Sequence, residues 1–403
     1  MVPTREDRML ALRLGAAATL FLLLVGQAQI TVLDGSSMLA VAQSIVHHGS
    51  LNVPPALGVP GDDGLFYSKY GLLLPLLSVI PVALVQPIGV VTGRVDLLEA
   101  AFAASLMPLV GGALTAALYL LGRRLGAPRA AAALVAAGTL LGTYLLPYGR
   151  DFFTEPLVAL GVVVMVERAL AGRERQAGAA LAFAILARPQ SAVFVPLLWA
   201  FLAARPGGAG ASAAAVSRGA DARGAADARG ADGRGADVAR GADARGAAVA
   251  PARVAIALRA ILRTAPSLAI AAAITVAYNL VRFGDPLEFG YKPPTDPGFT
   301  TPLLEGVRGL LLSPEKSLLL FAPALLLVPF AIVALWRVQR ATANLLVALF
   351  AATFVLAATW HSWMGGWSWG PRLVIPGVAV LLVALGPWIG EHATRMRIAA
   401  VLF

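Results

Sequence analysis

Thr31-Val32-Leu33-Asp34-Gly35-Ser36-Ser37 ends a long apolar run, residues 9–33, on a carboxylate. The stretch from Ser36 to Gly49 is amphipathic and predicts a short helix with a serine cap at its start and a glycine at its end. A polar, proline-rich loop then leads to Tyr70. An ionisable group at the end of a membrane helix is costly, which makes Asp34 a candidate functional residue. The alternative is that Asp34 only marks where the helix enters water.

The composition is that of a polytopic membrane protein. Of 403 residues, 58% are hydrophobic and 13% are charged, and the mean hydropathy is +0.77. The absence of cysteine excludes disulfides and thiolate metal sites, and the four histidines show no metal-binding spacing. The net charge of +10 comes from short arginine clusters between apolar runs. That pattern is a membrane-topology signal, so no nucleic-acid partner is expected.

Several apolar runs approach the roughly 20 residues that a helix needs to span a bilayer. The basic N-terminus is expected inside the cell and Asp34 outside. Residues 71–92 carry three regularly spaced prolines, which are expected to interrupt a regular helix. This stretch is therefore expected to form a re-entrant or interfacial segment on the outer side. Residues 177–204 contain Arg188-Pro189 and are expected to form two short helices that meet at a break. In all we expect about ten or eleven membrane helices. The runs are 9–33, 71–92, 97–121, 130–147, 154–170, 177–204, 254–281, 318–336, 343–360 and 372–390.

One segment has a different composition. Within residues 206–252, arginine and aspartate alternate among glycine and alanine. Such a segment buries too little apolar surface to offset its chain entropy, so residues 205–253 are expected to be a disordered cytoplasmic insert. The insert divides the chain into an N-terminal membrane module, residues 1–204, and C-terminal membrane helices, residues 254–403.

Two charged residues of the membrane module are candidates for chemistry on the outer side. Glu155 lies in Thr154-Glu155-Pro156, a helix-start pattern. It is either a first-turn acid at the positive end of a helix or a second carboxylate beside Asp34. Arg188, at the expected helix break, either pairs with one of these acids or binds a phosphate, for which a guanidinium is well suited.

The densest aromatic cluster runs from Trp360 to Arg372 and contains Gly-Gly and Gly-Pro steps. It is either an interfacial aromatic belt or a surface on which a sugar stacks beside an anion contact. Lys69 is one of several cations on the outer side, where cations are rare. It either snorkels to lipid headgroups or points to an anionic ligand.

The order of these features resembles the C-type (GT-C) glycosyltransferases, which include protein O-mannosyltransferases and lipid A aminoarabinose transferases. The shared features are an outer acid after the first helix, interfacial helices, the basic turn at residues 122–126, and Arg150 five positions before an acid. The strings at residues 278–287 and 363–372 also look like bacterial members. The resemblance covers most of the chain outside residues 206–252. It implies an all-α GT-C-like bundle, with interfacial helices in the first outer loop and an active cavity that faces outward.

The resemblance also implies an activity. The protein would move a hexose or pentose, with inversion, from a polyprenyl-phosphate donor to a glycan, lipid or protein of the cell envelope, at the outer face of the plasma membrane. Asp34 matches the catalytic acid, acting as general base on the acceptor hydroxyl, and Glu155 matches the second acid. The candidate ligands of the donor phosphate are Arg188, Arg372, Arg150 and Lys69. The candidate substrate-binding residues are Tyr70, Trp367, Trp369 and His361.

Two departures from the family stand out. Gly35 stands where many members carry a glutamate, and the chain ends at Phe403, where many members continue into a soluble domain. No cofactor is implied; a divalent metal remains an open alternative that is not indicated, because the chain has no Asp-x-Asp pair. The rival interpretations are a transporter or flippase of a lipid-linked sugar, and a non-catalytic scaffold of the same fold. A transporter predicts charged residues throughout midplane helices and internal repeats.

Overall fold

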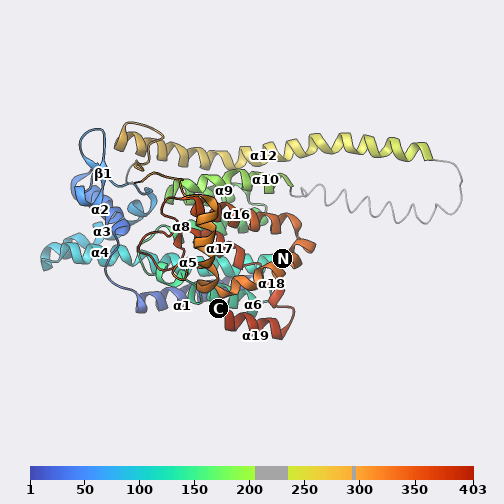
Figure 1. Ribbon diagram of the computed structural model, residues 1–403, viewed down its shortest axis with the longest axis horizontal. Helices are drawn as coiled ribbons and strands as arrows, with labels where there is room; N and C mark the ends of the chain where they lie inside the picture. Colours follow the sequence, from blue (N-terminus) through green and yellow to red (C-terminus); the bar gives the residue numbers. More distant parts are fainter. Residues whose placement is uncertain (205–234, 293–295) are drawn as a thin grey trace.

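The computed structural model describes residues 1–204, 235–292 and 296–403, and the side chains of all of these except 235–253. The described chain is an all-α membrane protein. Its sheet is one small antiparallel hairpin, in which β1 (Val59–Pro60) pairs with β2 (Phe66–Tyr67). This hairpin lies beside α2 at one end of the helical bundle (Figure 1).

Helices form nearly everything else, and most are joined by short turns (Figure 1). In chain order they are α1 (Arg5–Val25), α2 (Leu33–His48), η1 (Pro55–Leu57), α3 (Leu73–Thr92), α4 (Val95–Ala104), α5 (Leu106–Leu125), α6 (Arg129–Leu141), α7 (Leu145–Tyr148), α8 (Glu155–Leu170), α9 (Glu174–Ala187), η2 (Pro189–Val193), α10 (Phe194–Ala204), α12 (Gly235–Phe283), α13 (Leu303–Leu312), α14 (Leu318–Phe321), η3 (Pro323–Leu327), α15 (Val328–Val338), α16 (Arg340–Thr359), η4 (Arg372–Val374), α17 (Ile375–Leu382), α18 (Leu385–Ile389) and α19 (Ala393–Leu402).

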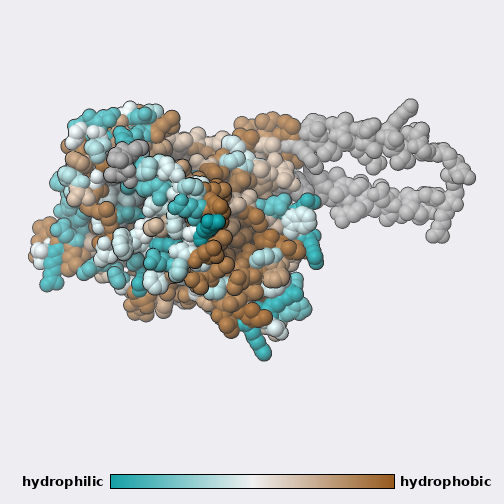
Figure 2. All heavy atoms as spheres, viewed as in Figure 1, coloured by the Kyte–Doolittle hydropathy of each residue, from teal (hydrophilic) through white to brown (hydrophobic). Residues whose placement is uncertain are grey.

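The helices carry the apolar surface that a membrane protein needs. Within the described residues, 5 helical stretches are long and apolar enough to cross a membrane. Shorter apolar helices accompany them, among them Arg129–Leu141 and Pro189–Ala204. Figure 2 shows a broad apolar band across the visible face, with hydrophilic side chains gathered beyond it around β1 and α2. The expected all-helical membrane class is confirmed, while the number of crossings stays a prediction. The 5 stretches are Arg5–Val25, Leu73–Thr92, Val95–Leu125, Val254–Phe283 and Arg340–Thr359.

The basic clusters meet at the N-terminal end of α1. Asp7 is fully buried there, and its Oδ1 lies 3.0 Å from Nε of both Arg123 and Arg129. Arg124 pairs in turn with Glu167 at 2.6 Å. The basic N-terminus and the basic segment around Arg123 and Arg129 therefore lie together, and α1 separates them from Asp34.

Helix α8 lies at the centre of the bundle and sets the position of the site. It packs against α5, α9 and α17. Helices α8 and α9 can pack closely because Gly161 has no side chain. A Cβ atom at this position would lie only 2.9 Å from the Ala180 carbonyl oxygen. The two helices are antiparallel, so the start of α8 at Glu155 lies beside the end of α9 at Ala187.

Helix α2 differs from its prediction at one end. It begins at Leu33, and its N-cap, Val32, makes no side-chain hydrogen bond, so the predicted serine cap is wrong. The predicted glycine stop is confirmed, since Gly49 adopts a left-handed conformation with φ 63°. Because α1 already ends at Val25, Asp34 lies in the first turn of α2, where the helix dipole favours an acid.

Two predicted helix breaks have opposite outcomes. The break at Arg188 is confirmed: this residue is extended, with φ −147° and ψ 111°, between α9 and η2. The predicted interruption of residues 71–92 is wrong, because α3 is continuous with Pro81 and Pro87 inside it. Each proline removes one helical hydrogen bond, and packing against α2 and α4 holds the remaining ladder. Whether α3 lies on the outer side stays a prediction.

Helix α12 begins earlier than the sequence predicts. It starts at Gly235, so residues 235–253, predicted to be disordered, are helical. Their high alanine content explains this, since alanine has the strongest helix propensity. The rest of the predicted insert, residues 205–234, lies outside the described residues. Helix α13 was not predicted; it occupies part of the long loop after α12 and packs against α16.

Candidate active site

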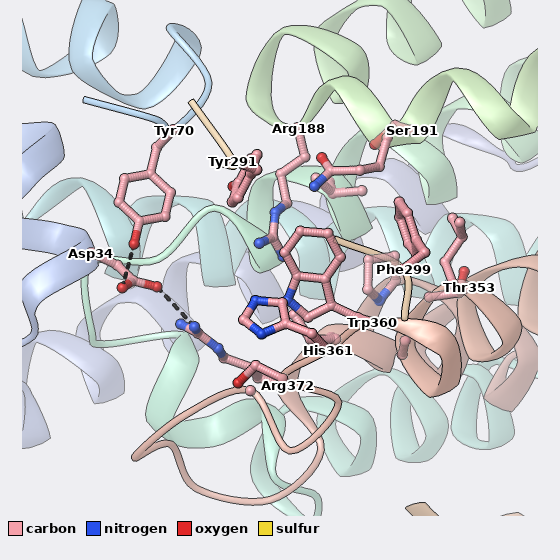
Figure 3. Close-up of a pocket in the computed structure, with 18 of the residues that line it drawn as sticks. Asp34, Tyr70, Arg188, Ser191, Tyr291, Phe299, Thr353, Trp360, His361 and Arg372 are labelled. Carbon is pink, nitrogen blue, oxygen red and sulfur yellow. Dashed lines mark hydrogen bonds and ion pairs between the residues drawn. The ribbon is translucent and has the colours of Figure 1, made fainter. Parts of the chain in front are cut away.

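A cavity of about 280 Å³ lies where α2, the break between α9 and η2, α16 and η4 meet. Figure 3 shows Asp34, Tyr70 and Arg372 at one part of its wall and Trp360, His361 and Phe299 at another. The polar and charged side chains of its lining are Asp34, Lys69, Tyr70, Arg188, Gln190, Ser191, Tyr291, Asp296, Thr353, His361, Ser362 and Arg372.

Asp34 is held by two partners. Its Oδ1 accepts a hydrogen bond of 2.6 Å from the Tyr70 hydroxyl, and its Oδ2 lies 2.8 Å from Arg372 Nη2 (Figure 3). Burial alone would raise the pKa of Asp34, but Arg372 and the bond from Tyr70 outweigh burial and lower this pKa. Burial, reinforced by the Asp34 charge, raises the pKa of Tyr70. Asp34 is therefore a carboxylate at neutral pH, and Tyr70 is a neutral hydrogen-bond donor.

Glu155 lies behind the cavity wall and is 2% exposed. Its Oε1 pairs with Arg188 Nη1 at 2.8 Å and lies 3.8 Å from Arg372 Nε. Arg372 therefore lies between the two acids and joins them, as the hypothesis of a second carboxylate beside Asp34 requires. Arg188 pairs with Glu155, as the first of its two predicted roles requires. It also lines the cavity, so its second predicted role, binding a phosphate, stays a prediction.

A second charged cluster lines the same cavity. Asp296 accepts a close ion-pair contact from Lys69 at Oδ2, and its Oδ1 lies 2.8 Å from His361 Nε2. Lys69 Nζ also lies 5.2 Å from the centre of the Tyr291 ring. The sequence predicted Lys69 and His361 in the site but missed Asp296, which lies in a long loop without a recognisable pattern.

The aromatic lining comes from an unexpected part of the tryptophan cluster. Trp360 lies edge-on to Tyr291 and Phe299, with ring centres 5.2 and 5.0 Å apart. Trp367 is fully exposed, Trp369 is 65% exposed, and neither lines the cavity. The prediction that these two tryptophans lie in the site is therefore wrong. Gly366 and Gly370, with positive φ angles of 69° and 62°, place left-handed turns directly beside these two tryptophans.

Arg150 is also outside the cavity. Its Nη1 donates to the Val25 carbonyl oxygen at 3.2 Å, and its Nε lies 3.9 Å from Asp151 Oδ1. The guanidinium thus fastens the end of α1 to the segment before α8. The prediction that Arg150 is a ligand of the donor phosphate is therefore wrong, because its guanidinium lies outside the cavity.

The loop before η4 sets the position of Arg372. Lys316 Nζ donates to the Gly366 carbonyl oxygen at 3.2 Å, and the Tyr148 hydroxyl donates to the Trp369 carbonyl oxygen at 2.7 Å. Burial and the nearby Arg372 charge lower the pKa of Lys316. A Cβ atom on Gly365, whose φ is 72°, would lie 2.9 Å from Arg372 Cγ. Gly365 therefore leaves the space that the arginine side chain occupies.

Gly35 is required by close packing. A Cβ atom there would lie 2.7 Å from Ile30 Cγ2 and 3.0 Å from the Phe152 carbonyl oxygen. A larger side chain at this position would push α2 away from the segment that leads into α8. This packing leaves no room for a larger side chain, such as a glutamate, at the position after Asp34.

We expect Gly35→Ala to lower the free energy of unfolding by about 1–3 kcal/mol, because the added methyl group overpacks this contact. Equilibrium unfolding of the purified protein in detergent would measure the change. Ser36→Ala, at the next position, adds no atom beyond Cβ and is the matched control. Equal stability of the two variants would contradict the close contact.

A second cavity, of about 440 Å³, adjoins the first and shares Tyr70, Arg188 and Tyr291 with it. Arg282 lines it and is 3% exposed. The guanidinium donates to neutral acceptors, namely the Asn279 side-chain oxygen at 2.6 Å and the Tyr278 and Ser68 carbonyl oxygens. The site therefore extends from the first cavity into the second.

Within the described residues, no three His, Asp or Glu side chains are grouped so as to hold a metal ion. The chemistry that the described site offers is that of paired carboxylates and arginines beside an aromatic wall. Such a site can bind an anionic group, accept a proton and pack against a sugar ring.

No protein-family model and no curated protein sequence match the chain. Solved structures do match. ArnT from Cupriavidus metallidurans, bound to undecaprenyl phosphate, is 16% identical with a TM-score of 0.54, over 96% of this chain and 63% of that one. The oligosaccharyltransferase of Archaeoglobus fulgidus, in complex with Zn and sulfate, is 15% identical with a TM-score of 0.52, over 97% and 50%.

The archaeal oligosaccharyltransferase AglB from Archaeoglobus fulgidus, in complex with an inhibitory peptide and a dolichol-phosphate, is 12% identical. Its TM-score is 0.51, over 99% of this chain and 54% of that one. The chain thus spans between half and just under two thirds of the length of these structures. ArnT and AglB are GT-C glycosyltransferases. The likeness confirms the GT-C-like membrane fold that the sequence resemblance implies.

Proposed function

We propose that the protein is a glycosyltransferase that moves a sugar from a polyprenyl-phosphate donor to a hydroxyl group of a cell-envelope glycan, lipid or protein. The proposed place of reaction is the outer face of the plasma membrane. The observation that carries the proposal is one cavity, in a GT-C-like fold, where Asp34 and the buried Glu155 share Arg372. Two of the similar solved structures hold undecaprenyl phosphate and dolichol-phosphate, which supports a lipid phosphate as donor.

In the proposed reaction the acceptor oxygen attacks the anomeric carbon of the sugar, and the bond from that carbon to the phosphate oxygen breaks. The phosphate keeps the bonding electron pair, and the acceptor proton passes to Asp34. Both Asp34 oxygens already have partners, but a carboxylate offers about four lone-pair sites, so it still has room for the acceptor hydroxyl. A single displacement of this kind inverts the anomeric configuration.

The other cavity residues have separate tasks in this proposal. Arg372, Arg188 and Lys69 stabilise the charge that develops on the departing phosphate. Tyr70 keeps Asp34 in place through its hydrogen bond of 2.6 Å. Trp360 and Tyr291 provide the aromatic wall, and His361 lies beside them in contact with the substrate. Glu155 holds Arg188 and Arg372 at the distances that the site requires.

A transfer assay tests the proposal. Membranes that contain the protein, and membranes that lack it, are incubated with a panel of polyprenyl-phosphate sugars labelled in the sugar. We expect label to leave the lipid and appear on a cell-envelope acceptor only where the protein is present. Sealed vesicles of both orientations identify the face, because transfer to an impermeant acceptor requires the active face to be outermost.

The transporter alternative predicts a different result in the same vesicles. A flippase would carry the labelled lipid across the membrane without breaking its bond to the sugar. Transfer is favoured because Asp34, Glu155 and Asp296 gather at one cavity, where each of these acids pairs with an arginine or lysine. Label that crosses the membrane while it stays on the lipid would reject the transferase.

A further inference from the structure

The second cavity contains a cation that no described acid neutralises. Arg282, in the last turn of α12, is 3% exposed and lines this cavity. Its guanidinium donates to the Asn279 side-chain oxygen and to two carbonyl oxygens, and among the described residues no carboxylate lies within ion-pair distance of it. Glu288, the acid in the described lining, pairs with Lys292 at 3.5 Å. A buried charge without a counter-ion is costly, so this cavity is suited to an anionic ligand.

Unused hydrogen-bond donors point to the same ligand. The bonds of the guanidinium use three of its five N–H groups, which leaves two donors in the described structure. The Tyr278 hydroxyl is buried and makes no hydrogen bond within the part of the chain that the structure describes, and Tyr278 also lines the cavity. The centre of its ring lies 3.7 Å from the guanidinium carbon of Arg282, so these donors are neighbours. The charged oxygens of a phosphate would satisfy both groups.

The place of Arg282 relative to Asp34 suits a single displacement. Asp34 lines the first cavity and Arg282 the second, and the wall that the two cavities share includes Tyr70, Arg188 and Tyr291 (Figure 3). In a reaction that inverts the anomeric carbon, the base and the departing group act on opposite faces of the sugar. A phosphate held at Arg282 meets this condition when the sugar lies at the shared wall, and it leaves the first cavity to the acceptor.

We propose that the donor's phosphate binds in the second cavity, against Arg282 and the Tyr278 hydroxyl, and that its sugar extends past the shared wall to Asp34. The inference rests on the proposed function and names the residues that select a lipid phosphate. As the bond between the anomeric carbon and the phosphate oxygen breaks, the phosphate keeps the electron pair and Arg282 stabilises the charge that it gains, while the acceptor proton passes to Asp34. Ile274 of α12 and Leu72 give the cavity apolar surface for the first units of the lipid chain.

Binding of a simple diester tests the inference without knowledge of the sugar. The probe is farnesyl methyl phosphate, which carries one negative charge at neutral pH, and farnesol is its neutral counterpart. The affinity of the full-length protein in detergent for each is measured by calorimetry. We expect the wild type to bind the diester about a hundredfold more tightly than farnesol, because each hydrogen bond to a charged group strengthens binding by about tenfold.

Two substitutions separate the phosphate contact from the fold. Tyr278→Phe removes a hydroxyl that has no described partner to lose, so the free energy of unfolding should not fall, while affinity for the diester should drop about tenfold. Arg282→Gln removes the charge and should bring the affinity for the diester down to that for farnesol. Affinity for farnesol should stay constant in both variants. Tyr144→Phe is the matched control and should bind as the wild type does, because its hydroxyl is also buried without a described partner but Tyr144 is outside the described lining of both cavities.

The inference is overturned if either Tyr278→Phe or Arg282→Gln binds the diester as tightly as the wild type. The preference for the diester would then come from the first cavity, and the proposed function would stand. Equal losses of affinity for the diester and for farnesol would also overturn the inference, because they would show a structural role, as would an equal loss in Tyr144→Phe. A wild type that binds the diester no more tightly than farnesol would instead reject a lipid-phosphate donor, and with it the proposed function.

Discussion

Asp34→Asn should lower the rate of sugar transfer by about 10³-fold, because it removes the proposed proton acceptor and leaves the rest of the cavity in place. The amide still accepts the hydrogen bond from Tyr70, and Arg372 keeps Glu155 as a neighbour at 3.8 Å. The loss should therefore fall on kcat, while the affinity for the donor changes little.

The measurement compares initial rates of transfer by purified wild type and variant at saturating donor. Asp62→Asn is the matched control, since it removes an exposed acid from the hairpin that follows α2 and should leave the rate unchanged. Unchanged transfer by Asp34→Asn would rule out Asp34 as the base. A loss of the folded protein would instead appear as a lowered unfolding midpoint, which separates the two causes.

The sequence predicted the class of fold and part of the site because both leave local signals. Apolar runs identify helices of a membrane protein, and the Arg188-Pro189 step identifies a break because proline disfavours a helical conformation at the residue before it. Asp34 and Glu155 were both found as acids at the ends of apolar runs. The arginine clusters assign both acids to the same side of the membrane, and this assignment is the reason for the hypothesis that they share one site.

The predictions from the sequence were wrong or incomplete where contacts between distant residues determine the structure. Nothing in the local sequence separates Trp360, which follows α16 and lines the cavity, from Trp367, which is fully exposed. Asp296 is brought to the site by pairing with Lys69, a residue more than 200 positions earlier. Helix α3 stayed continuous because its packing compensates for two lost hydrogen bonds.

Arg372 lies within ion-pair distance of both Asp34 and Glu155, and we expect Arg372→Met to have the largest effect on stability. It would leave Asp34, whose side chain is 23% exposed, without its ion-pair partner, and would leave the buried Glu155 with Arg188 alone. Removing one partner of a buried ion pair typically costs about 3–5 kcal/mol, because the other charge remains desolvated. We expect a loss of about 3 kcal/mol in equilibrium unfolding in detergent, and no detectable transfer.

A double-mutant cycle with Asp34→Asn shows whether the missing pair causes this loss. If the orphaned carboxylate is responsible, adding Asp34→Asn to Arg372→Met should restore about 1–3 kcal/mol of stability while transfer stays absent. Arg372→Lys keeps one charge but cannot reach both acids, so it should be more stable than Arg372→Met and still lose most of the activity. Additive effects of the two substitutions would contradict the pairing. Full activity of Arg372→Lys would show that charge alone, without the bridge between Asp34 and Glu155, is sufficient.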